Sequence, residues 1–137
     1  IEAAVSIPLL NMVELSVAKA VESLSPGANV GILASPAVRL AGVFDPALEK
    51  AELAALWPED TDRMLDAIRA IKTDGPTPGA RCILASAAKE LAGKGAALLL
   101  VACSEFSQIA DALPDTVPAT DTVDVLADAI HDHTLMK

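Results

Sequence analysis

The sequence predicts an α/β fold in which a parallel sheet is flanked by helices. Two short and nearly continuous apolar runs, Val30–Ala34 and Leu98–Ala102, have the composition of parallel strands that are buried on both faces. Each run is followed directly by a helix-start signal, and stretches of helical periodicity separate the two. This alternation is typical of a sheet whose strands are joined by helical crossovers.

The first half of the chain alternates strand candidates with stretches of helical spacing. Its helices are bounded by polar caps, prolines and glycines, which start and stop helical backbone. The expected elements are, in order, a strand end over Val5–Leu10, a helix from Asn11 to Pro26-Gly27, the strand Val30–Ala34, a helix that begins at Ser35-Pro36, a helical piece over Pro46–Lys50 and a weak strand over Glu52–Trp57.

The second half repeats the alternation with longer helices. Apolar residues recur there at three- and four-residue spacing, which predicts amphipathic helices with one buried face. The expected elements are a helix from Asp60 or Thr61 through Ile71, a break at Asp74–Gly79, a helix from Ala80 to Leu91, the strand Leu98–Ala102, a helix from Ser104 to Pro114, a short strand over Thr116–Ala119 and a helix from Asp121 to about Asp132.

Composition and charge narrow the classes of function. With 137 residues, 53% of them hydrophobic, the chain suits one globular domain with its own core. The net charge is −9 and the basic residues are scattered, so neither nucleic acid nor an anionic membrane surface is an expected partner. The longest apolar run, Ala96–Cys103, is too short to span a bilayer. Two cysteines make no disulfide framework, so we expect a cytoplasmic protein.

Two strand ends are candidate binding positions, because ligands of parallel α/β sheets bind beyond the carboxyl ends of the strands. Cys103 leaves one strand and enters a helix, whose positive field stabilises a thiolate and can lower its pKa below about 8.5. Such a thiol is a nucleophile or a proton-transfer base; the alternative is a small buried hydrophobe. Ser35 follows the other strand, where it either caps the helix or holds the carboxylate of a small anionic substrate.

Ser104 and Glu105 follow Cys103 directly, and each has two interpretations. Ser104 either caps the helix or donates to a substrate carboxylate. Glu105 complements the helix dipole, but its charge opposes ionisation of the neighbouring thiol, so we expect Cys103 to be partly activated. Cys82 lies nearly opposite the apolar stripe of its helix and is expected to be incidental. The two histidines have no converging ligand set, so no metal site is expected.

Four stretches, taken in order, resemble the C-terminal half of proteins in the aspartate/glutamate racemase superfamily. Order and spacing agree over nearly the whole chain, and Cys103-Ser104-Glu105 is similar to the Cys-Thr/Ser-Glu signature of that family. Glu105 resembles the residue that the aspartate-type and hydantoin-type branches of the superfamily carry at this position, directly after the Thr or Ser of the signature. The four stretches are IPLLNMVE (Ile7–Glu14), VGILASPAVRLAGVF (Val30–Phe44), GAALLLVACSEFSQI (Gly95–Ile109) and VPATDTVDVLADAI (Val117–Ile130).

The resemblance implies a cofactor-independent racemase or epimerase of a small amino acid or carboxylic acid, which uses neither pyridoxal phosphate nor a metal. Family members have two pseudo-symmetric, Rossmann-like α/β halves, and each half supplies one cysteine to opposite faces of the substrate Cα. By this resemblance Cys103 is the catalytic thiol of the second half, while Ser35, Ser104 and Glu105 lie at the substrate. The family's second hydroxyl residue is replaced here by Val38, which removes one polar contact.

The resemblance also implies a domain organisation. Residues 1–116 are expected to form the second α/β domain, and residues 117–137 to pack on an N-terminal half. Because the chain begins at Ile1 inside an apolar pattern, we expect it to be incomplete and inactive by itself. Two alternatives stay open: a one-cysteine decarboxylase or cis–trans isomerase of small diacids in the same superfamily, and a non-catalytic α/β ligand-binding domain. Assembly into a homo-oligomer is also open.

Two geometric expectations follow for the site. Right-handed crossovers place the carboxyl ends of parallel strands on one edge of the sheet, so Ser35 and Cys103 are expected to border a common cleft. Cys103, rather than Cys82, is expected to be the reactive thiol.

Overall fold

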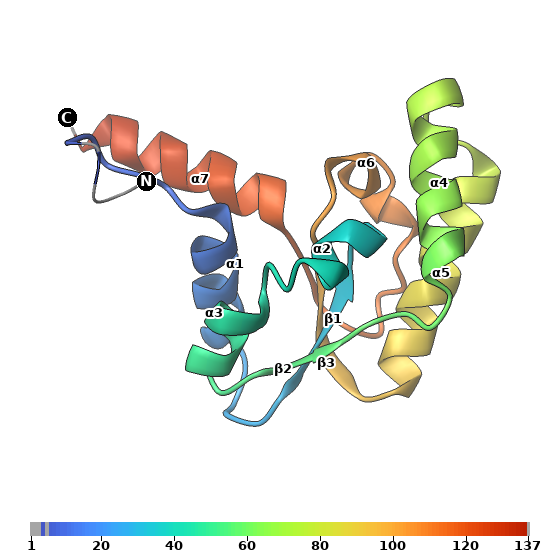
Figure 1. The fold of residues 1–137 in the computed structure, drawn as a ribbon, viewed down its shortest axis with the longest axis horizontal. Helices are drawn as coiled ribbons and strands as arrows, with labels where there is room; N and C mark the ends of the chain where they lie inside the picture. The colour runs from blue at the N-terminus through green and yellow to red at the C-terminus, as the bar shows by residue number, and fades with distance from the viewer. Residues whose placement is uncertain (1–3, 5, 137) are drawn as a thin grey trace.

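The computed structural model describes residue 4 and residues 6–136, and four strands within them form one sheet. The strands are β1 (Asn29–Leu33), β2 (Ala54–Leu56), β3 (Ala96–Val101) and β4 (Ala119–Asp121). Their order across the sheet is β2-β1-β3-β4, and all the pairings are parallel (Figure 1). The predicted α/β class with a parallel sheet flanked by helices is therefore confirmed.

Helices cover both faces of this sheet. On one face lie α4 (Thr61–Asp74) and α5 (Pro78–Gly93), and on the other lie α1 (Met12–Val21) and α3 (Asp45–Lys50) (Figure 1). The remaining helices are α2 (Pro36–Leu40), α6 (Ser104–Ser107), the 3-10 turn η2 (Ala110–Ala112) and α7 (Thr122–Leu135).

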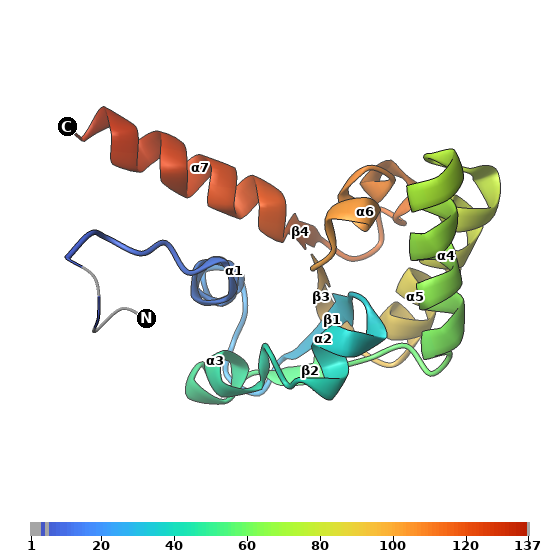
Figure 2. The ribbon, with the colours of Figure 1, turned by 45° about the horizontal axis from the view of Figure 1, so that its top comes forward.

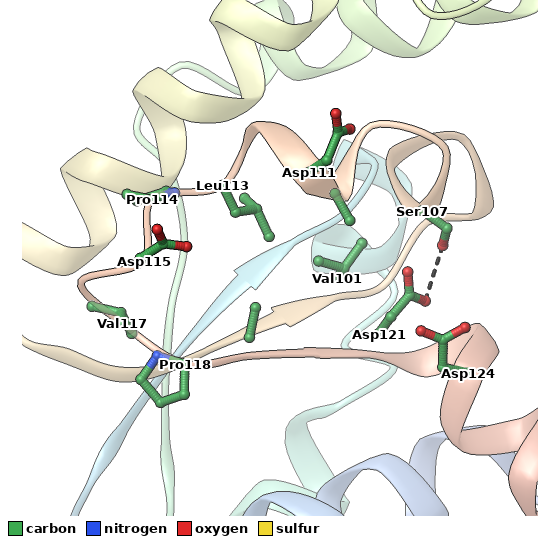
Figure 3. A pocket seen from close by; sticks show the side chains of 12 residues that line it. Val101, Ser107, Asp111, Leu113, Pro114, Asp115, Val117, Pro118, Asp121 and Asp124 are labelled. Carbon is green, nitrogen blue, oxygen red and sulfur yellow. Dashed lines mark hydrogen bonds between the residues drawn. The ribbon is translucent and has the colours of Figure 1, made fainter.

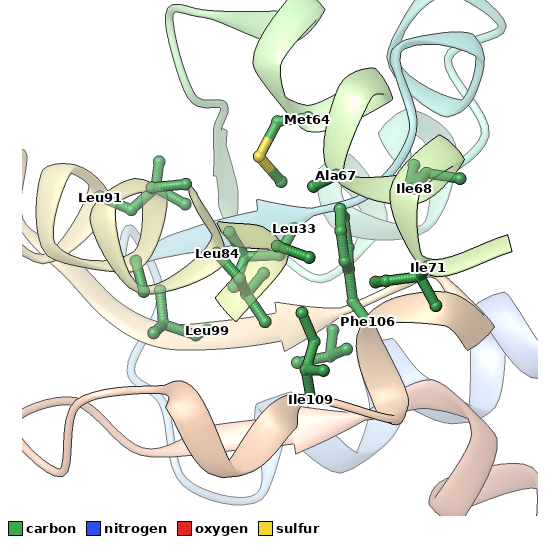
Figure 4. Packing of buried hydrophobic residues seen from close by; sticks show 14 of the residues in the cluster. Leu33, Met64, Ala67, Ile68, Ile71, Leu84, Leu91, Leu99, Phe106 and Ile109 are labelled. Atoms are coloured by element: carbon green, nitrogen blue, oxygen red, sulfur yellow. The ribbon is translucent and has the colours of Figure 1, made fainter. Parts of the chain in front are cut away.

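Successive side chains of a strand point to opposite faces of the sheet, so the two central strands supply two hydrophobic cores. Ile32 of β1 and Leu100 of β3 pack toward α1 and α3. Leu33 and Leu99 point the other way, into the core under α4 and α5, where Phe106 is also fully buried (Figure 4). The predicted helical face of α4 is confirmed for its residues 64, 68 and 71, which are buried, whereas residue 65 is half-buried.

Polar side chains cap several helices, as the sequence predicts. Asn11 Oδ1 accepts from the backbone N–H of Val13 at 3.1 Å, and Asp60 Oδ1 accepts from Arg63 N–H at 3.0 Å. Asp121 Oδ1 accepts from Val123 N–H at 2.9 Å at the start of α7. Each bond satisfies one of the amide groups that a helix N-terminus leaves without an internal partner.

Several expected elements differ from the structure. The helix expected from Asn11 to Pro26-Gly27 ends at Val21. Residues 6–10 are irregular rather than strand, and Val5 lies outside the described residues. The single helix expected from Ser104 to Pro114 is instead α6 followed by η2, because the backbone leaves helical geometry at Ile109 (φ −127°), whose side chain is fully buried in the core. The last strand begins at Ala119 rather than Thr116, because Pro118 has no N–H to donate to a ladder.

Helix α7 lies beside α1 and extends away from the sheet (Figure 2). Thr122 in its first turn is buried, whereas Val123, Ile130 and Leu135 are exposed. The packing of residues 117–137 on another part of the protein stays a prediction.

Gly31 in the middle of β1 is a close contact point between the sheet and α5. A Cβ at this position would lie 2.9 Å from Leu99 Cδ2 and 3.1 Å from Leu91 Cβ. Both leucines are fully buried, so neither side chain can move aside without disturbing the core.

We predict that Gly31→Val destabilises the protein by about 2 kcal/mol or more, because the added methyl groups overpack this contact. The measurement is urea unfolding. Gly93→Ala is the matched control: apart from its chain neighbours and the backbone of its own helix, no heavy atom of the described residues lies within 4 Å of its added Cβ. Alanine favours helix, so a gain of roughly 0.5 kcal/mol is expected. Equal effects of the two substitutions would contradict the close packing at Gly31.

Candidate active site at the carboxyl edge of the sheet

The sheet brings the two predicted strand ends to the same edge. β1 and β3 are neighbours, Leu33 pairs with Val101, and the N–H of Ala102 donates to the carbonyl of Leu33 at 2.9 Å. Ser35 and Cys103 each stand two residues beyond this last pair. The expectation that both strand ends lie on one edge of one parallel sheet is confirmed, while a cleft shared by Ser35 and Cys103 stays a prediction.

The thiol of Cys103 belongs to a hydrogen-bonded cluster centred on Glu105. Cys103 Sγ–H donates to Glu105 Oε2 at 3.0 Å, and the hydroxyl of Ser104 donates to the same oxygen at 3.3 Å. Glu105 Oε1 pairs with Lys72 Nζ at 3.3 Å. Because Lys72 lies in the last turn of α4, the carboxylate connects the strand end after β3 with the end of that helix.

Burial, together with the hydrogen bond to Glu105, raises the pKa of the Cys103 thiol to about 11. The backbone N–H groups of Glu105 and Phe106 act in the opposite direction but are outweighed. The expected lowering of this pKa is therefore wrong: α6 has only four residues, and burial of the thiol disfavours its charged form more than one helical turn favours it. The expected opposition of Glu105 to ionisation is confirmed.

The same contacts lower the pKa of Glu105. The hydrogen bond from Cys103 is the largest cause, and the ammonium group of Lys72 acts in the same direction, while partial burial opposes both. At neutral pH the pair is therefore a thiol beside a carboxylate. Lys72 compensates the negative charge and leaves its own ammonium group mostly exposed, with 65% of the side chain accessible.

Ser35 occupies the N-cap position of α2 with an extended backbone (φ −68°, ψ 153°). Its side chain makes no capping hydrogen bond to any residue that the structure describes, so capping does not account for this hydroxyl. The one-turn helix α2 is held instead by Val38, which packs on the core, and by Arg39, whose guanidinium lies over the ring of Trp57 at 5.8 Å from the centroid. A substrate-binding role of Ser35, Ser104 or Glu105 stays a prediction.

Cys82 lies on α5 and is exposed, on the side opposite Leu84 and Leu91, which are buried in the core. This placement confirms that it is outside the apolar stripe of its helix. In the part of the chain that the structure describes, no three histidine, cysteine or acidic side chains converge to hold a metal ion. None of the helices over residues 6–136 combines the length and apolarity that crossing a membrane requires.

A pocket of about 480 Å³ lies beside β4, where no motif of the sequence predicts one. Val101, Ser107 and Asp121 line the part shown on the right of Figure 3, where the hydroxyl of Ser107 donates to Asp121 Oδ1 at 2.9 Å. Asp121 was predicted only as a helix cap. Neither Ser107 nor Lys72 could be found from the chain alone, because both meet their partners through the fold.

One family and several solved structures are similar to this chain. The profile of a family described as Asp/Glu/hydantoin racemase matches residues 1–130. Among curated proteins, no sequence matches this one.

Several solved structures share the fold. An aspartate racemase from Picrophilus torridus is 24% identical with a TM-score of 0.76, and the match covers 90% of this chain and 52% of that one. An aspartate racemase homologue from Pyrococcus horikoshii (16% identity, TM-score 0.74) is covered to 58%, with 95% of this chain matched. A glutamate racemase from Bacillus anthracis (15%, TM-score 0.67) is covered to 52%, with 98% matched. The chain thus spans little more than half the length of these proteins.

We predict that Glu105→Gln lowers the pKa of Cys103, because a neutral amide accepts the thiol hydrogen bond weakly and no longer repels the thiolate. Alkylation of Cys103 by iodoacetamide at pH 8, followed by mass spectrometry, should accelerate on the order of 3- to 10-fold. Glu49→Gln, which removes an exposed carboxylate on α3, is the control and should leave the rate unchanged. Slower alkylation in Glu105→Gln would contradict the assigned role of the carboxylate.

Proposed function

The chain belongs to the Asp/Glu/hydantoin racemase family, and we propose that it is part of an isomerase that racemises or epimerises a small amino acid or carboxylic acid at Cα. In this proposal Cys103 is one of the two groups that move the proton, and neither pyridoxal phosphate nor a metal takes part. The observation that carries it is the Cys103–Glu105 pair, a thiol and a carboxylate 3.0 Å apart at the carboxyl end of a central strand.

The protonation state of this pair suits delivery of a proton. With a pKa of about 11, Cys103 rests as the thiol. When a carbanion-like intermediate forms at Cα, the S–H bond breaks, a C–H bond forms on that face, and the thiolate remains. Racemisation requires an acid on one face of the substrate Cα and a base on the opposite face.

In the reverse direction Cys103 has to remove the Cα proton as a thiolate. The thiolate that remains after proton delivery does this: the Cα–H bond breaks and the S–H bond of Cys103 forms again, while the carboxylate of Glu105 accepts the hydrogen bond of the restored thiol. The group on the opposite face comes, in this proposal, from the part of the protein that precedes this chain. The length that the chain lacks relative to the similar structures leaves room for such a half.

Substrate recognition is proposed for the polar groups around the thiol. The hydroxyl of Ser35 makes no capping bond to any described residue and is available to donate to a substrate carboxylate, and the hydroxyl of Ser104 can do so when it turns away from Glu105. The exposed ammonium group of Lys72 supplies a positive charge beside Glu105. Glu105, proposed from the family resemblance as a substrate residue, acts through the thiol and through Lys72 in this account.

A second candidate is a one-cysteine decarboxylase of small diacids in the same superfamily. Two observations favour it. The Cys103 thiol is protonated, which suits a group that only donates a proton. Val38 stands where racemases of the superfamily carry their second hydroxyl residue. Release of carbon dioxide from a substituted malonate, without racemisation of any amino acid, would select this candidate.

We predict that Cys103→Ser lowers kcat for racemisation by about 10³-fold or more in the complete protein, because a hydroxyl is a far weaker base at neutral pH. Chiral chromatography of aspartate, glutamate and other small amino acids measures the rate. Cys82→Ser, an exposed cysteine outside the site, is the control and should keep full activity. Full activity of Cys103→Ser, or its loss in Cys82→Ser, would show that the wrong thiol has been chosen.

We predict that Lys72→Met raises KM for a dicarboxylic amino acid on the order of tenfold, because one charge-assisted contact to the substrate is lost. Lys89→Met on the exposed face of α5 removes the same charge outside the site and should leave KM unchanged. Steady-state kinetics give the KM of each variant for comparison with that of the unaltered protein. An equal rise in KM would mean that net charge, rather than the position of Lys72, governs binding.

A further inference from the structure

A polar link joins the segment of Cys103 to the junction between β4 and α7. Asp121 Oδ1 accepts from the hydroxyl of Ser107 at 2.9 Å and from the N–H of Val123 at 2.9 Å (Figure 3). The hydroxyl of Ser107 also lies 3.3 Å from the carbonyl oxygen of Cys103, which accepts from the N–H of Ser107 at 3.1 Å. Ser107 therefore contacts both the backbone of Cys103 and the carboxylate of Asp121.

Apart from this link, the segment that carries Cys103 is held by the Lys72–Glu105 ion pair and by its buried apolar side chains. α6 is a single turn, and Cys103 stands at its N-cap position. Phe106, fully buried in the core, holds one side of this turn. The other side, where Ser107 lies half-buried, is tied to the sheet through Asp121 at the end of β4. A one-turn helix is marginal by itself, so such tertiary contacts determine its position.

We propose that Ser107 and Asp121 are positioning residues for Cys103: the Ser107–Asp121 hydrogen bond fixes α6 and thereby the orientation of the thiol. This inference rests on the proposed function, in which the direction of the S–H group toward Cα sets the rate. A hydrogen bond to a carboxylate is stronger than one between neutral groups, and this one is half-buried, so it restrains α6 more than an exposed serine would.

The link has a directional consequence for the thiol. Without it, α6 loosens on the side of β4, and water reaches the Cys103 side chain. Burial is what disfavours the thiolate, so loosening makes the thiol easier to ionise while it misdirects the S–H group. The kcat should therefore fall while the thiol becomes easier to ionise.

Ser107→Ala tests the inference in the complete protein, since it removes the link and leaves the Asp121 cap of α7 in place. We expect kcat to fall about tenfold with KM within about twofold, because misplacement of a catalytic group affects the chemical step. We also expect the pH midpoint for alkylation of Cys103 to move down. Ser107→Thr keeps the hydroxyl and should restore both values. Ser23→Ala, which removes a serine hydroxyl that donates to a helix carbonyl away from the site, is the control and should change neither.

The outcomes separate this inference from the proposed function. An alkylation midpoint that stays the same in Ser107→Ala overturns the link, whatever the activity. A midpoint that moves down in Ser107→Ala, and not in Ser107→Thr or Ser23→Ala, supports the link even if the protein racemises no amino acid, in which case the proposed function fails by itself. Equal loss of kcat in Ser107→Ala and Ser107→Thr also overturns it.

Discussion

The parallel pairing of β1 with β3 is the constraint on which the rest of this structure depends. Its register, with Leu33 opposite Val101, sets which side chains enter each core and where both strands end. A shift by one residue would turn every buried side chain to the wrong face. Gly31 allows α5 to approach the sheet closely. The carboxyl edge of the two paired strands carries Ser35, Cys103 and the turns that follow them.

At that edge, burial and hydrogen bonding decide the chemistry more than helix dipoles do. The two helices that follow Ser35 and Cys103 are single turns, so their fields are weak. The half-buried thiol instead donates a hydrogen bond to Glu105, whose negative charge is compensated by Lys72. The result is a protonated cysteine with an adjacent acceptor, an arrangement that can give a proton to carbon and take one back.

The sequence predicted the sheet, most helices and the shared edge, because the periodicity of apolar residues and the caps Asp60 and Asp121 are local signals. It misjudged the segment after Cys103, where burial of Ile109 ends the helix early, and it misjudged the thiol pKa, which depends on how deeply the fold buries the side chain. Lys72 and Ser107 were not found because Lys72 meets Glu105, and Ser107 meets Asp121, only through the fold.

The central claim is that this protein moves a proton at the Cα of its substrate. The most direct measurement incubates the complete protein with single enantiomers of aspartate, glutamate and other small amino acids in D₂O and follows the Cα proton by ¹H NMR. A thiol exchanges its proton with solvent, so the account predicts that the Cα–H signal of one amino acid disappears and that the opposite enantiomer emerges with deuterium at Cα. Retention of the Cα–H signal in every amino acid tested, with the protein folded, would contradict it.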